Sequence, residues 1–224
     1  MLVLNVSTVN IRKYRYPMNE PNKKYHHGDV PRALMDAALV SIRENGVERL
    51  SLRALARDVG ISQTAPYRHF KDKTHLLVKL ASEGFYTLAA QKRSTRTTPY
   101  SQENLIDVGI AYVQFAKNHP EQYKLMFGSS IEHRRDYPEL MDASHTAFQC
   151  IFEHVEEGIN AGFLVDRDPE ILAKSCWTTV HGIASLLIDG FFENIDYDFD
   201  DFLRQQVTFN IRGISKSPQT IKSQ

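Results

Sequence analysis

The sequence has few of the residues and patterns that mark secreted, membrane or metal proteins. It has only two cysteines, Cys150 and Cys176, without the spacing of metal ligands, so we expect ordinary buried thiols. No run approaches the roughly 18 apolar residues of a membrane helix. The opening MLVLNV is too short and wrongly flanked for a signal peptide. These absences favour a soluble cytoplasmic protein that does not act at a membrane.

Motifs of the common enzyme classes are also missing. The sequence contains no H-E-x-x-H, no glycine-rich phosphate loop and no paired-carboxylate motif. We therefore expect no catalytic residues, no cofactor and no metal site. One interpretation to be weighed is a helical small-molecule-binding protein or enzyme. In such a protein, the histidines and Cys176 would have to do the chemistry.

The charges are unevenly distributed although the net charge of the 224 residues is zero. Residues 1–98 carry 17 Lys and Arg against 8 Asp and Glu, whereas residues 99–224 carry 10 against 19. A basic half suits contact with the phosphates of a nucleic acid, which would repel an acidic half. A chance split of surface charge is the competing interpretation.

The segment SLRALARDVGISQTAPYRHF, residues 51–70, predicts two short helices joined by a tight turn. Ser51 has the side chain of an N-cap, the apolar residues that follow it have helical spacing, and Gly60 suits a helix end. Ser62 is expected to cap the second helix, and Pro66 to make its first turn short or tight. A helix-turn-helix of this kind is either a DNA-reading unit or plain packing, and its place in the basic half favours the former.

The rest of the chain predicts helices and no strands. Apolar spacing, N-caps and breaker residues place about nine helices in an all-α protein, at residues 31–45, 51–59, 63–70, 72–92, 101–118, 120–127, 138–161, 170–188 and 200–214. We divide the chain into a flexible basic arm, a helix-turn-helix DNA-binding domain, a ligand-binding and dimerisation domain, and a tail: residues 1–24, 25–75, 76–214 and 215–224. The arm either touches DNA or only aids solubility.

With KYHHGDVPRALMDAAL before it and FKDKTHLL after it, the motif resembles the TetR family of bacterial transcriptional regulators over residues 24 to about 90. CWTTVHG, with Trp177, His181 and Gly182, looks like the W-H-G signature of one subgroup. The resemblance implies an all-helical homodimer of nine or so helices per chain, three of which form the DNA-binding domain. It further implies a regulator, most often a repressor, that a small and largely apolar effector releases from a palindromic operator on double-stranded DNA. Pro66 and His75 depart from the leucine and glutamate that are more usual in the family.

The same resemblance assigns candidate DNA contacts. Gln63, Thr64, Ala65, Tyr67 and Arg53 match groove-facing positions, where glutamine suits adenine and arginine suits guanine. Tyr67, His69 and Lys73 match positions that contact the DNA backbone. Arg68 either reads a base or only adds positive field. The predicted DNA-binding set is Arg53, Ser62, Gln63, Thr64, Ala65, Tyr67, Arg68, His69 and Lys73.

Candidate effector contacts are aromatic and sulfur residues along the later helices: Phe85, Tyr112, Phe115, Met126, Phe148, Phe152, Trp177 and His181. For each of them, core packing is the alternative. Trp177 and His181 are one turn apart and share a helix face, where they either orient a polar group of the ligand or fill the core. The last two helices carry an apolar stripe, Ile183, Leu187, Phe202, Val207, Ile211 and Ile214, that suits either a dimer interface or internal packing.

Overall fold

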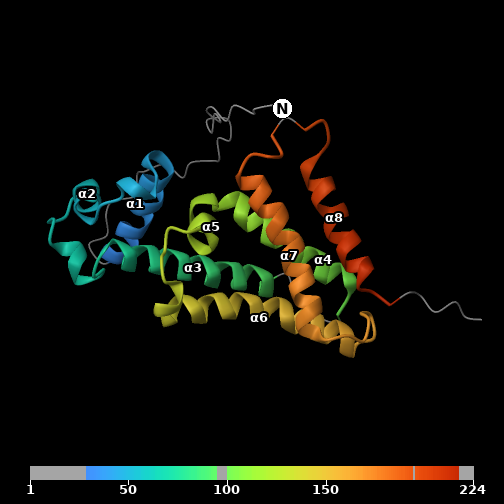
Figure 1. The fold of residues 1–224 in the computed structure, drawn as a ribbon. Helices are drawn as coiled ribbons and strands as arrows, with labels where there is room; N and C mark the ends of the chain where they lie inside the picture. Colours follow the sequence, from blue (N-terminus) through green and yellow to red (C-terminus); the bar gives the residue numbers. More distant parts are fainter. Residues whose placement is uncertain (1–28, 95–99, 194, 217–224) are drawn as a thin grey trace, which may run out of the picture.

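The computed structural model describes residues 29–94, 100–193 and 195–216 (Figure 1). The described residues form eight α-helices and three short 3₁₀ turns, and they contain no strand beyond an isolated bridge between Leu164 and Ser215. The order is α1 (Val30–Asn45), η2 (Val47–Arg49), α2 (Leu52–Asp58), η3 (Ala65–Arg68), α3 (Lys73–Ser94), α4 (Gln102–Asn118), α5 (Pro120–Phe127), η4 (Arg134–Asp136), α6 (Pro138–Asn160), α7 (Pro169–Ile188) and α8 (Phe199–Gly213). The all-α expectation is therefore confirmed. The predicted arm, residues 1–24, lies outside the described residues.

A small head, formed by α1, α2 and η3, lies at one end of the molecule (Figure 1). The Asp29 side chain caps α1 by accepting from the backbone N–H of Arg32. Leu34, Ala38 and Ile42 follow at helical spacing and are buried, which seats α1 against α2 and η3. Local sequence signals therefore account for the start of α1 and for the face that it buries.

The predicted third helix at residues 63–70 is wrong in type. The chain forms only the 3₁₀ turn Ala65–Arg68, with Thr64 rather than Ser62 at its N-cap. Pro66 has no N–H to donate and its ring is buried in the head, so a tight turn replaces the first turn of an α-helix. This correction brings the α-helix count from the predicted nine to eight in the described part of the chain.

Helix α3 leaves the head and runs into the body alongside α6 (Figure 1). It starts after Asp72, whose carboxylate accepts from the backbone N–H of His75 at 2.8 Å. In return, Nδ1 of His75 accepts from the backbone N–H of Lys71 at 3.2 Å. His75 therefore supplies the reciprocal bond of a capping box. It accepts from the backbone N–H of Lys71, whereas the usual glutamate would accept from that of the next residue, the N-cap Asp72.

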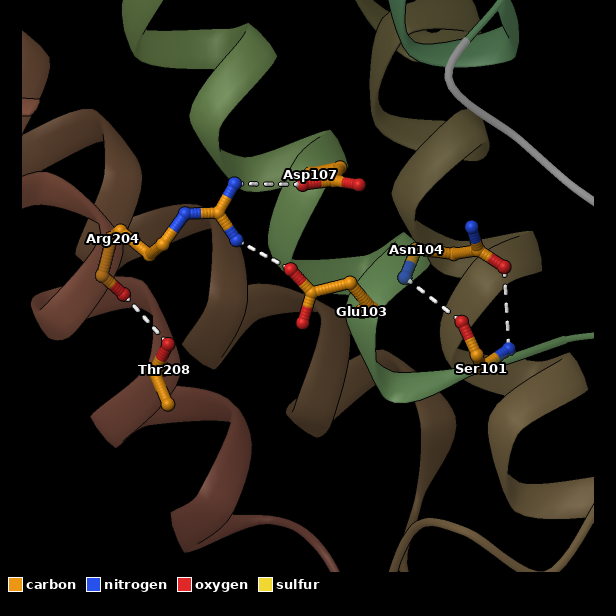
Figure 2. A network of polar contacts seen from close by, with 6 residues as sticks. All are labelled: Ser101, Glu103, Asn104, Asp107, Arg204 and Thr208. Carbon is orange, nitrogen blue, oxygen red and sulfur yellow. Dashed lines mark hydrogen bonds and ion pairs between the residues drawn. The ribbon is translucent and has the colours of Figure 1, made fainter.

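In the body, α4, α5 and α6 pack on α3. Helix α6 lies alongside α3, α7 packs on α4 and α6, and α8 packs on α4 and α7 at the end away from the head (Figure 1). Two side chains cap helices of the body: Ser101 forms a capping box with Asn104, and Asp168 accepts from the backbone N–H of Glu170. Figure 2 shows the Ser101 box beside an ion pair between α8 and α4, in which Arg204 contacts Glu103 and, at 3.2 Å, Asp107. These contacts fix the start of α4 and the seat of α8.

The apolar stripe of the last two helices faces inward. Ile183, Val207, Ile211 and Ile214 are buried in the core of the single chain, so for them the packing interpretation is correct. Other residues of α7 and α8 carry the exposed apolar surface: Ile171 is 63% exposed and Phe209 is 59% exposed. Most of the stripe therefore packs within the chain, and a dimer interface on these helices stays a prediction.

Helix α7 alone among the described helices is long and apolar enough to cross a membrane, with a mean hydropathy of 1.3. The expectation that no segment approaches such a composition is therefore too strong. A core helix of a soluble protein passes the same test, and α7 packs against α4, α6 and α8. One such helix is weak evidence for a membrane span.

Candidate nucleic-acid interface and ligand cavity

The predicted DNA-contact residues lie on the outer surface of the head. Eight of the nine belong to the α2 to η3 segment, and most of these are exposed: Arg53, Ser62, Gln63, Thr64, Tyr67, Arg68 and His69. Ala65 is half-buried where η3 begins. Tyr67, 47% exposed, presents a large aromatic ring to solvent. The exposed side chains can reach another molecule, and contact with DNA stays a prediction for each residue.

Lys73 is bonded to a part of the head that is distant in the sequence. Its Nζ donates to the carbonyl oxygen of Glu48 at 3.1 Å, which ties the start of α3 to η2. The side chain is half-buried, so this bond holds α3 at a fixed place on the head. The predicted phosphate contact remains untested, and the structure adds a positioning role.

Two of the predicted effector contacts, Tyr112 and Trp177, line a cavity in the body. The cavity measures about 20 Å³, which is room for roughly one water molecule. Its walls come from five helices: α3, α4, α6, α7 and α8. The lining residues are Lys92, Leu105, Val108, Gly109, Tyr112, Ile151, Cys176, Trp177, Thr179, Val180, Val207, Asn210 and Ile211.

The other predicted contacts do not line this cavity. Phe85, Phe115 and Met126 are buried in the core, where Phe85 meets Phe127 edge to face at 5.2 Å between centroids. Phe148 and Phe152 are half-buried against the same core. Aromatic residues at helical spacing fit a core and a cavity wall equally well, so composition could not separate them.

A buried polar network surrounds His181. Trp177 Nε1 donates to the hydroxyl of Tyr112 at 3.3 Å, and the Tyr112 and Tyr123 hydroxyls are 3.0 Å apart. His181 Nδ1 lies 2.7 Å from the Tyr123 hydroxyl and 3.1 Å from that of Tyr112. A consistent assignment runs from Trp177 through Tyr112 and Tyr123 to an unprotonated Nδ1 of His181. Trp177 and His181 therefore share one face, as predicted, but their polar atoms bond within the protein.

Burial governs the titration of this network. It lowers the pKa of His181 and raises that of Tyr112 to about 12, because removal from water disfavours the charged form of each group. Burial also raises the pKa of Tyr123. All three groups are therefore neutral at neutral pH, which suits the chain of hydrogen bonds.

Lys92, the charged residue in the cavity wall, is not among the ligand contacts predicted from the sequence. Lys92 is 3% exposed, its Nζ donates to the carbonyl oxygen of Ala147 at 3.2 Å, and it lies 5.1 Å from the centroid of the Tyr112 ring. Burial lowers the pKa of its ammonium to about 8. The signal was present, because Lys92 follows Phe85 and Leu88 at helical spacing on the buried face of α3.

Helix α5 connects the polar network to the head. Its Glu121 carboxylate accepts from Arg43 of α1 at 2.8 and 3.2 Å, and Tyr123, two residues later, belongs to the network. Near the start of α1, Arg32 pairs with Glu83 of α3. The head therefore meets the body through ion pairs to α5 and α3.

The described residues hold no group of three or more His, Cys, Asp or Glu side chains placed to bind a metal ion. Cys150 and Cys176 are both buried thiols, as expected. Burial raises the pKa of Cys176 to about 12, which keeps this cavity-lining thiol protonated and weakly nucleophilic.

Comparisons with known proteins give one family model that matches the head and the start of α3 and another that matches most of the body. Residues 34–80 match the model of bacterial regulatory proteins of the tetR family, and residues 105–209 match the model of a tetracyclin repressor-like C-terminal domain. An HTH-type transcriptional regulator, itself uncharacterised, from Haemophilus influenzae is 32% identical over 101 residues, which are 44% of this chain and 49% of the relative. The match thus spans about half the length of that curated relative. The W-H-G motif as a subgroup marker stays a prediction.

Solved structures share the whole fold. A protein of unknown function from Rhodococcus sp. RHA1 is 29% identical, with a TM-score of 0.74 over 87% of this chain and 100% of its own. A bacterial regulatory protein in the tetR family, also from Rhodococcus RHA1, has a TM-score of 0.67 at 17% identity over 84% and 98% of the two chains, a likeness of fold alone. Since family models match both the head and the body, the chain belongs to the tetR family of bacterial regulatory proteins.

Proposed function

We propose that this protein is a cytoplasmic DNA-binding transcriptional regulator, a repressor that a small molecule bound in the body releases from its operator. The observation that carries the proposal is the row of exposed polar and aromatic side chains from Arg53 to His69 on the outer face of the helix-turn-helix. Base recognition needs such side chains free to reach a groove, with others to meet phosphates. Gln63 and Arg53 are the proposed base readers, and Tyr67 and His69 the proposed backbone contacts.

The route from effector to DNA is proposed to be α3. Lys73 in its first turn is bonded to the head, and Lys92, 19 residues later, lines the cavity. At 1.5 Å per residue this rigid element spans about 28 Å. A ligand that binds one position of α3 better than another would shift the heads toward that position and change operator affinity.

We propose a homodimer formed by α7 and α8. These helices pack on each other and leave Ile171, Leu186 and Phe209 exposed, an apolar surface that a second copy would cover. Two heads would then meet successive major grooves about 34–36 Å apart, which calls for a near-palindromic operator. Sedimentation should show a dimer for the wild type and a monomer for Phe209→Glu. Tyr86→Glu, which alters an exposed aromatic residue of α3, serves as the control.

The DNA proposal is tested by binding of the ligand-free protein to the DNA that flanks its own gene, at two salt concentrations and against shuffled competitor. We expect competitor-resistant binding that weakens steeply with salt. Gln63→Ala should weaken specific binding about tenfold or more because it removes a bidentate base contact. Arg167→Ala, a change at an exposed residue between α6 and α7, should leave binding unchanged.

Binding that is indifferent to sequence, followed by failure of a random-sequence selection, would overturn the DNA proposal. In that case the alternative of a helical small-molecule-binding protein or enzyme would stand, and turnover without DNA would be its test.

A further inference from the structure

The cavity wall combines an apolar lining with one buried cation. Leu105, Val108 and Ile151 are buried aliphatic residues, and the remaining lining is largely of the same character. Most of the polar lining atoms bond within the protein: Trp177 donates to Tyr112, Thr179 to the Ser175 carbonyl, and Asn210 to the Ser175 hydroxyl. A ligand therefore meets a surface that is apolar except at Lys92.

The buried position of Lys92 strengthens the electrostatic attraction between its ammonium and an anion. The Lys92 Nζ donates to the carbonyl oxygen of Ala147 and lies over the ring of Tyr112, in a region from which water is largely excluded. Charges interact more strongly there than in water, and an ammonium strongly prefers an anion to a neutral group. Its lowered pKa of about 8 still leaves it mostly protonated at pH 7. A cationic ligand would be repelled.

We propose that this cavity binds an apolar carboxylic acid as its anion, with the Lys92 ammonium as counter-ion and the aliphatic wall around the hydrocarbon part. The proposal rests on the regulator function above and names the chemical class of its effector. A single cation matches a single negative charge, which favours a carboxylate over a doubly charged phosphate ester.

Binding of such a molecule must widen the cavity. A volume of about 20 Å³ is far below the several hundred Å³ of typical ligand sites, so the five lining helices have to separate. Lys92 belongs to α3, the helix that enters the head, and Gly109 marks where α4 approaches Val207 and Val180 closely. Separation of the cavity wall at Lys92 displaces α3 directly.

The single tryptophan of the chain, Trp177, lines the cavity and gives a direct optical readout. Quenching of its fluorescence is measured at pH 7, without DNA, during titration with hexanoate and decanoate below micellar concentrations and with the amides of both acids. We expect at least one acid to bind about tenfold or more tightly than its amide, the size of effect expected for a charged hydrogen bond.

Variants then assign the preference to Lys92. Lys92→Met should remove the preference for the acid while leaving amide binding in place, and Lys92→Arg should keep it. The control is Arg93→Met, which removes the same charge from the exposed neighbouring position. A cooperative thermal transition for each variant shows that it is folded.

The proposal is overturned if neither acid binds the wild type, if neither is preferred over its amide, or if Lys92→Met keeps the preference. Its failure is distinguishable from failure of the regulator function because operator binding is measured on the ligand-free protein. Loss of the acid preference would leave operator binding intact, and absence of an operator would leave the acid site intact.

Discussion

In the head, the side chains with proposed roles are exposed and make few contacts with the rest of the protein, whereas in the body they are buried and bonded to one another. Gln63 and Arg53 reach into solvent from a short turn and a short helix. Tyr112, Tyr123 and His181 come from three helices and share one buried network. A surface site depends on a local motif, but a buried site depends on how distant segments pack.

The contrast also concerns the cost of charge. The basic residues of the head stay in water, where a charge costs little. Lys92 in the body is buried, and burial lowers the pKa of its ammonium from 10.5 to about 8. The body therefore holds a costly group at the place where we propose that a ligand binds, which is typical of functional sites.

The largest expected effect is a gain in stability for Lys92→Met. A pKa that falls from 10.5 to about 8 on folding corresponds to a cost on the order of 3 kcal/mol. The cost is fully present below pH 8, where both folded and unfolded states are protonated, and it is relieved as pH rises toward 10.5. Denaturant unfolding at pH 7 and pH 10 should show the variant more stable at pH 7, with the difference reduced at pH 10.

The matched control for that prediction is Arg93→Met, which should change stability little at either pH because the side chain is exposed. A Lys92→Met variant that is less stable than the wild type at pH 7 would show that Lys92 stabilises the folded body rather than destabilising it.

Substitution of two glycines tests whether close packing in the body costs more stability than backbone conformation in the head. At Gly109 a Cβ would lie 2.9 Å from Val207 Cγ1 and 3.3 Å from Val180 Cγ1, so Gly109→Val should destabilise by about 2–3 kcal/mol. At Gly60 a Cβ would meet nothing within 4 Å, but φ is 73°, so Gly60→Ala should cost about 1 kcal/mol from backbone strain.

Thermal unfolding of both variants measures this difference. Equal losses of stability at the two positions would contradict the expectation that packing sets the cost of substitution at Gly109 and backbone conformation sets it at Gly60.

Removal of a single hydroxyl tests the buried network. Tyr123→Phe removes the closest partner of His181 Nδ1 and should destabilise by about 1–2 kcal/mol, although Tyr112, at 3.1 Å, can take over part of that bond. Tyr86→Phe, at a residue 48% exposed, should lie within about 0.5 kcal/mol of the wild type. Equal stability of the two variants would mean that the network contributes nothing.

The smallest expected effect concerns the ion pair between the two regions. Arg43 is exposed, whereas the Glu121 side chain is only 16% exposed, and ion pairs near the surface contribute about 0–1 kcal/mol, so Arg43→Ala should lower the free energy of unfolding by at most about 1 kcal/mol. Because this pair joins α1 to α5, we expect the change to alter instead how strongly a bound acid weakens operator binding. Lys174→Ala, which breaks an exposed pair within α7, should leave that coupling unchanged. A large loss of stability for Arg43→Ala would contradict this expectation.

The prediction of the head succeeded where the signals were local and failed where a single residue changed the geometry. Ser51 and Gly60 predicted the two ends of α2 from their own neighbourhood, and the structure has α2 between them. Pro66 was expected to tighten a helix, but it reduces the helix to a 3₁₀ turn, because a missing donor and a buried ring outweigh the preferences of the residues around it.

The all-α class, most helix ends and the family could be predicted from the sequence alone, because caps, breakers and apolar spacing act within a few residues. Only the tertiary structure decided which aromatic residues line the cavity, which face of α8 is exposed, and that Lys92 is buried beside Tyr112. These depend on contacts between residues far apart in the chain. An amphipathic pattern shows that a helix has a buried face but not which helix will cover it.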